Sequence, residues 1–120
     1  MQYMLLIYNN EKAWEELPES ERNAMFGEYM QFTNDIKASG HWRAGDALQP
    51  IHTATTVRVR GGKTQTTDGP FAETRETLGG YYIVEAKDLD EATKIAARIP
   101  DARIGNGSVE IRPVMVFEGM

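Results

Sequence analysis

The sequence predicts an α+β fold of the ferredoxin-like type, in which two helices lie on one face of a mainly antiparallel sheet. Short apolar or alternating runs typical of strands are separated by two longer stretches with the apolar period of a helix. Their order along the chain is strand, helix, a group of strands with a hairpin, helix and strand. With right-handed crossovers, this order places both helices on the same face.

Length and composition indicate one domain over residues 1–120. The hydrophobic fraction of 41% and charged fraction of 26% are typical of a globular protein. A net charge of −5 argues against nucleic-acid or anionic-membrane partners, which favour basic surfaces. No apolar run approaches the roughly 20 residues of a membrane span, and the N-terminus does not resemble a signal peptide. We therefore expect a cytoplasmic protein.

The first strand and first helix follow from residues 3–39. Residues 3–8 are all apolar, which predicts a central strand covered on both faces. After Pro18, apolar side chains recur at spacings of four, three and four, at Met25, Tyr29, Phe32 and Ile36. This pattern predicts a helix that Gly40 closes. Gly27 weakens that helix, and close packing against a neighbour would explain its presence.

The middle of the chain predicts three strands. Residues 55–60 alternate apolar and polar side chains, Gly61-Gly62 is typical of a two-residue hairpin turn, and residues 63–67 form the return strand. Residues 79–84 predict another strand. Its Tyr81 and Tyr82 should face opposite sides of the sheet.

The second helix and last strand follow. Asp88 and Glu91 have the spacing of a capping box, and Pro100 should stop the helix that they open. Residues 109–117 predict a strand in which Pro113 indicates a sheet edge or a bulge. Because both helices cover one sheet face while the first strand is apolar on both sides, we expect a homodimer that buries the other face.

The stretch TDGPFAETRE, residues 67–76, is the main candidate site. Asp68-Gly69-Pro70 is typical of a turn, in which Asp68 bonds backbone N–H groups. Alternatively, the turn aims Asp68 into a cleft between sheet and hairpin, where burial would raise its pKa for acid–base work. Glu73 is a second catalytic candidate and Arg75 an anion-binding one. Phe71, rather than Tyr81 or Tyr82, is expected to lie closest to the cleft.

Other candidates are more scattered. Arg58 and Arg112 would form an anion site if their strands were neighbours, with Glu110 orienting Arg112; otherwise Glu110 and Arg112 are a surface pair. His52 is the better placed histidine for titration near neutral pH. His41 and His52 lack metal-binding spacing and the chain has no cysteine, so we expect no metal. We expect no cofactor either.

The run ATTVRVRGGKTQTTDGPFAETRETLGGYYIVEAKDLDEA, followed by EIRPV, resembles the YCII-related family with its DGPF motif. The resemblance covers roughly residues 1–117. It implies a dimeric α/β-barrel, related in fold to muconolactone isomerases and to heme-dependent or cofactor-free monooxygenases. It also suggests a histidine–aspartate pair, but here Tyr29 falls near the position of the helix histidine, and Asp68 is the candidate aspartate.

Three functions remain open. The first is a cofactor-free enzyme, an isomerase, a lyase or monooxygenase-like, which acts on a small molecule through Asp68 and Glu73. The second is a non-catalytic module that binds a ligand or a partner, and the resemblance suggests a link to sigma-factor regulation. The third is a purely structural dimer. Burial of Asp68 or Glu73 would favour the enzyme, and exposure of both would favour the binding module.

Overall fold

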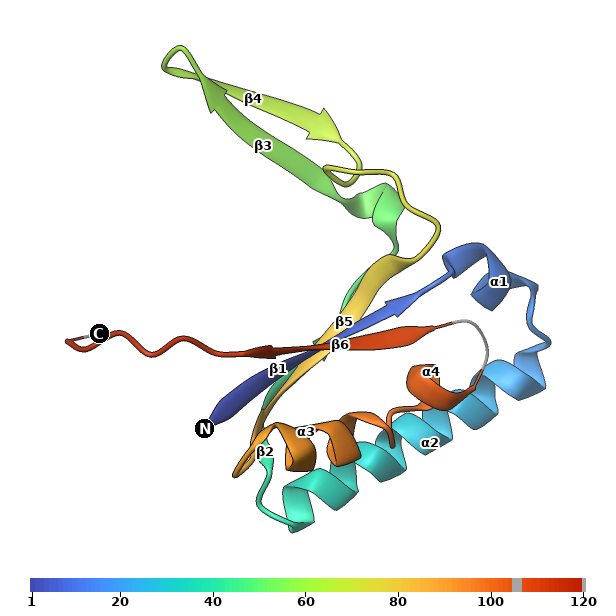
Figure 1. The fold of residues 1–120 in the computed structure, drawn as a ribbon. Helices are drawn as coiled ribbons and strands as arrows, with labels where there is room; N and C mark the ends of the chain where they lie inside the picture. The colour runs from blue at the N-terminus through green and yellow to red at the C-terminus, as the bar shows by residue number, and fades with distance from the viewer. Residues whose placement is uncertain (105–106, 120) are drawn as a thin grey trace.

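A computed structural model describes residues 1–104 and 107–119 of the chain (Figure 1). The elements are β1 (Gln2–Asn9), α1 (Glu11–Glu16), α2 (Glu19–Ala38), β2 (Trp42–Ala47), the short 3₁₀ helix η1 (Ile51–Thr53), β3 (Thr55–Arg60), β4 (Lys63–Asp68), β5 (Thr77–Glu85), α3 (Leu89–Ala96), α4 (Pro100–Arg103) and β6 (Ser108–Pro113). Without the β3–β4 hairpin and η1, this is the βαββαβ pattern of the ferredoxin-like plan.

The main sheet has four strands in the order β2–β5–β1–β6, and every neighbouring pair is antiparallel. In the register of its centre, Leu5 of β1 lies opposite Tyr82 of β5 and Ile111 of β6. The predicted α+β class with a mainly antiparallel sheet is therefore confirmed. Pro113 ends β6, and β6 forms one edge of the sheet. Proline is tolerated at such an edge, because an N–H group that points away from the sheet would have no strand to bond with.

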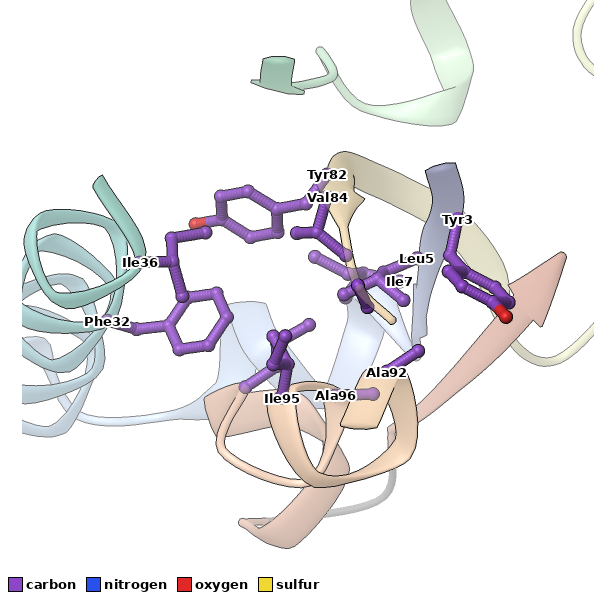
Figure 2. Packing of buried hydrophobic residues seen from close by; sticks show 12 residues of the cluster. Tyr3, Leu5, Ile7, Phe32, Ile36, Tyr82, Val84, Ala92, Ile95 and Ala96 are labelled. Carbon is purple, nitrogen blue, oxygen red and sulfur yellow. The ribbon is translucent and has the colours of Figure 1, made fainter. Parts of the chain in front are cut away.

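The core lies between one face of this sheet and the helices α2 and α3 (Figure 2). Leu5, Ile36 and Ile99 are fully buried there. Phe32 of α2 meets Tyr82 of β5 edge to face, with ring centroids 5.1 Å apart. The apolar stripe predicted along residues 25–36 thus packs on the sheet.

The opposite face of the sheet is uncovered within one chain. Alternate residues of β1 differ accordingly: Leu5 and Ile7 are buried, whereas Met4, Leu6 and Tyr8 are only half-buried. The single chain therefore covers one face of this strand, as expected, and the other face is the one that the expected second copy would cover. The reason is that the helices α2, α3 and α4 all lie on the same side, as Figure 1 shows.

The ends of α2 agree with the prediction. At its C-terminus the N–H groups of His41 and Gly40 donate to the carbonyls of Ile36, at 2.9 Å, and Lys37, at 3.2 Å. The explanation given for Gly27 is wrong, because a methyl group there would meet no atom within 4 Å.

Four elements of the fold escape the sequence analysis, namely α1, β2, η1 and α4. Helix α1 is capped by Asn10, whose side-chain oxygen accepts the N–H of Ala13 at 3.1 Å. Strand β2, with the sequence WRAGDA, lacks a clear alternation but pairs with β5. In addition, Pro100 is the first residue of α4, a position that suits proline because a first-turn N–H has no partner in the helix.

The β3–β4 hairpin projects away from the rest of the molecule (Figure 1). Gly61 and Gly62 have φ angles of 57° and 77°, which fit the predicted two-residue turn. Every residue of β4 is exposed, and Val57 and Val59 of β3 are 59% and 58% exposed. The radius of gyration is 16.4 Å, against about 14 Å for a compact chain of this length. The hairpin is thus an arm without a core of its own.

Candidate functional site

A cavity of about 480 Å³ lies beside α1 and α2 and the β2–β5 side of the sheet. Its wall contains six aromatic residues, Trp14, Phe26, Tyr29, Trp42, Tyr81 and Tyr82. A concave, largely apolar site of this size with a few polar groups is typical of small-molecule binding. This cavity is the first candidate site in the structure.

The β2–β5 wall of the cavity depends on a close approach at Gly45. A methyl group there would lie 2.7 Å from Cδ1 of Tyr82 and 3.0 Å from Cζ3 of Trp42. The absent side chain therefore lets both rings lie against β2, with their centroids 6.0 Å apart. The hydroxyl groups of Tyr82 and Thr33 are hydrogen-bonded at 2.8 Å, which joins this wall to α2.

The polar centre of the cavity is a pair formed by Tyr29 of α2 and Asp101 of α4. The Tyr29 hydroxyl donates a hydrogen bond to the carboxylate of Asp101, which is only 9% exposed. Burial raises the pKa of Tyr29 well above its ordinary value, and the hydrogen bond to Asp101 and the negative charge of that group raise the pKa further. Tyr29 therefore stays protonated over the physiological range and acts as a donor.

A second cavity, of about 440 Å³, adjoins the first along α1 and the start of α2. Asn9, Trp14 and Asp101 contribute to the walls of both cavities. Asp101 is thus a lining residue of both hollows, although it is largely buried.

Asp68 of the DGPF motif is placed differently from the prediction. It is the last residue of β4, opposite Thr55, so the strand is one residue longer than expected and the turn begins at Gly69. The backbone of Gly69 accepts a hydrogen bond from the Thr56 hydroxyl at 2.8 Å and donates one to the Ala54 carbonyl at 2.7 Å. These contacts fix the turn at the base of the arm, while Asp68 itself is exposed.

The rest of the motif also lies on the surface of the single chain. Phe71 is 82% exposed, and Glu73 and Arg75 are exposed as well. None of the three is among the residues that line the large cavity, whereas Tyr81 and Tyr82 are. The arrangement within one chain is thus the reverse of the expected one, because the hollow lies between sheet and helices rather than between sheet and hairpin.

The other candidates are dispersed. Arg112 lies on β6 of the main sheet, with its Nη1 3.8 Å from Oε2 of Glu110, whereas Arg58 lies opposite Gln65 in the separate hairpin. Within one chain the two arginines therefore do not form a site. His52 is exposed in η1, two residues after Pro50, which lines the cavity.

Sequence reasoning missed Asp101 and the tryptophans of the cavity. Asp101 directly follows Pro100, which we took only as a helix stop, and Trp14 lies in the unpredicted α1. Among residues 1–104 and 107–119, no three potential ligand side chains are grouped for a metal ion. None of the helices described in the structure has the length and apolar character needed to cross a membrane.

Comparison with known proteins identifies the family of the chain. A family model described as the YCII-related domain matches residues 1–118. The chain is also 31% identical over 118 residues to the uncharacterized protein R00369 of Rhizobium meliloti (strain 1021), a match that covers 98% of this chain and 95% of the relative. This chain belongs to the YCII-related family.

Proposed function

We propose that this YCII-related protein binds a small organic molecule in the cavity beside α1, α2 and the sheet. The observation that carries the proposal is the aromatic wall around the Tyr29–Asp101 pair. The rings of Trp14, Phe26, Tyr29, Trp42 and Tyr82 offer a large apolar contact area, and one buried carboxylate with a fixed donor offers orientation. The exposure of Asp68 and Glu73 favours binding over catalysis by the motif of a single chain.

The binding test compares two substitutions of alanine by phenylalanine. Ala47 lines the cavity on β2, and Ala72 lies in the exposed motif segment. A metabolite library is screened by thermal shift, since a ligand that binds the folded state raises the melting temperature. We expect Ala47→Phe to abolish the shift given by a hit and Ala72→Phe to retain it. The opposite result would move the site to the motif.

The second candidate function is acid–base catalysis in the same cavity. The buried carboxylate of Asp101, hydrogen-bonded to a phenol, is a group that can accept or hold a proton close to a bound substrate. Turnover of a hit by the wild type, lost in Asp101→Asn but with the ligand still bound, would establish an enzyme. Binding without turnover by the wild type would leave the protein a binding module.

The protein also works as a homodimer in this proposal. The half-buried row Met4, Leu6 and Ile83 on the helix-free face, together with the exposed Val57 and Val59 of the arm, gives a second copy two apolar surfaces to cover. A dimer closed through that sheet face would have the dimeric α/β-barrel arrangement that the family resemblance implies.

In such a dimer the motif segment would meet the partner subunit. Asp68, Glu73, Arg75 and Phe71 lie at or beyond the base of the arm, and burial there would give them the desolvated surroundings that catalysis or ligand binding requires. The DGPF segment would then add to a site across the interface. If the second copy covers these residues, the backbone amides of residues 68–76 should exchange hydrogen with solvent more slowly in the dimer than in the monomer.

A further inference from the structure

The cavity wall is acidic. Glu11, Glu15 and Asp101 carry carboxyl groups, a fourth acidic lining residue, Asp46, directs its side chain to the other face of the sheet, and none of the lining residues in the described part of the chain is a lysine, an arginine or a histidine. The remaining residues of the sequence, Gly105, Asn106 and Met120, have no cationic side chain. An anionic ligand would therefore have to enter beside like charges with no cationic side chain among the lining residues.

The carboxylates do not share a single point. Oε1 of Glu11 accepts the N–H of Ile51 at 2.9 Å, and the carboxylate of Asp101 accepts the hydroxyl of Tyr29. Asp46 accepts the hydroxyl of Tyr81 at 2.7 Å, and both residues project to the other face of the sheet by strand alternation. This spread of charge along the wall, with no metal-binding group in the described residues, suits an extended organic molecule better than a compact metal ion.

The aromatic wall adds to the attraction for a positive charge. The faces of tryptophan and tyrosine rings carry negative charge density and bind ammonium groups within about 6 Å of the ring centroid. The chain already shows this contact at Trp42, where the ammonium nitrogen of Lys37 lies 4.6 Å from the ring centroid. Arg22 is another cation near this region, but its guanidinium donates to the backbone carbonyl of Glu15 at 3.2 Å.

From this combination we infer that the cavity selects an organic cation, a molecule with an ammonium group on an apolar or aromatic body. The ammonium group lies against the carboxylate of Asp101 and the neighbouring rings, and the apolar body lies against the Trp42 and Tyr82 rings, which are in contact with each other. The inference rests on the proposed function, because it takes the cavity to be the ligand site.

The test uses three probes of similar size: 2-phenylethylammonium, 2-phenylethanol and phenylacetate. Amide shifts of cavity residues are followed by NMR titration of the full chain. We expect the cation to bind about tenfold tighter than the neutral probe, and the anion to bind weakest. The preference for the cation should also decline with added salt.

Three variants assign the preference to the cavity. Asp101→Asn should remove most of the cation preference and leave the affinity for 2-phenylethanol unchanged. Glu15→Gln should reduce the preference for the cationic probe to a smaller degree. Because Glu15 is exposed, this variant should fold, so the inference can be tested even if Asp101→Asn does not fold. Glu118→Gln makes the same change of net charge outside the cavity and should have no effect.

The outcomes separate this inference from the proposed function. Equal affinities for the three probes, or tightest binding of phenylacetate, overturn the cation inference while the cavity remains a binding site. Absence of any shift at the cavity amides with the cationic probe also overturns it. The proposed function fails separately, when library hits bind Ala47→Phe as well as they bind the wild type.

Discussion

In the body of the molecule, alternate residues of β1 and β5 are buried under helices, whereas nearly every residue of the β3–β4 arm is exposed. Both regions are antiparallel sheet with clear strand signals in the sequence. They differ in what lies on them: α2 and α3 cover one face of the body, whereas none of the helices in residues 1–104 and 107–119 covers the arm (Figure 1). A two-stranded ribbon alone is marginal in water, so the arm depends on further contacts for its stability.

The difference also separates the two candidate sites. The cavity with Tyr29 and Asp101 belongs to the body and is complete within one chain, whereas Asp68, Glu73 and Phe71 belong to the base of the arm and to the segment after it. The first site needs only the fold of one chain, whereas the second would need the proposed partner subunit.

The largest expected effect contrasts core and arm directly. Leu5→Ala removes a fully buried side chain from β1 and should lower the free energy of unfolding by about 2–5 kcal/mol. Val59→Ala, in the exposed arm, should cost less than about 1 kcal/mol, measured by urea denaturation at a protein concentration below that of dimer formation. Equal losses would mean that the arm is packed on the body.

The next effect concerns the uncovered sheet face. Leu6→Glu places a charge among the half-buried residues of that face and should shift the protein from dimer to monomer in sedimentation at micromolar concentration. Glu28→Gln, on the helix side, is a control that should leave the dimer intact. A wild type that sediments as a monomer would contradict the dimer.

A smaller effect appears at high pH. The folded chain holds the proton of Tyr29 more tightly than the unfolded chain, so this contribution to stability is complete below about pH 10 and declines as the pH rises further. Tyr29→Phe should therefore flatten the alkaline loss of stability, besides costing about 1–3 kcal/mol at neutral pH through the lost hydrogen bond to Asp101.

The matched variant is Tyr81→Phe, which also loses a hydrogen bond to a carboxylate, that of Asp46. Because Tyr81 is less buried than Tyr29, its effect on the alkaline slope should be smaller. Denaturation curves between pH 7 and pH 11 give both slopes. An unchanged slope in Tyr29→Phe would show that another group controls the alkaline transition.

The smallest effect on stability is expected at Asp68. In the single chain its carboxylate is exposed, so Asp68→Asn and Asp68→Ala should each change the free energy of unfolding by no more than about 0.5 kcal/mol. A loss above about 2 kcal/mol in both variants would make Asp68 a structural residue of the turn. Loss of ligand binding in Asp68→Asn, with the fold intact, would show that the motif charge contributes to the site.

The elements that could be predicted are those with a local signal. Strand β1, helices α2 and α3 and the hairpin follow from apolar period, capping residues and the Gly61-Gly62 turn. Strand β2 and helix α1 could not be predicted with the same ease, because WRAGDA has no alternation and α1 has only six residues. Both are held by tertiary contacts, and both line the cavity.

The candidate site shows the same division. The motif at residues 68–71 is visible in the sequence because a turn needs particular residues in succession. Asp101 carries no such signal: it lies 72 positions from Tyr29, and only the packing of α4 against α2 brings the two side chains together. The sequence by itself determined the fold class, the strands and helices with a local signal and the family, since these depend on local periodicity and contiguous motifs. The tertiary structure alone decided where the cavity lies and which charges face it, because these depend on side chains that meet from distant parts of the chain.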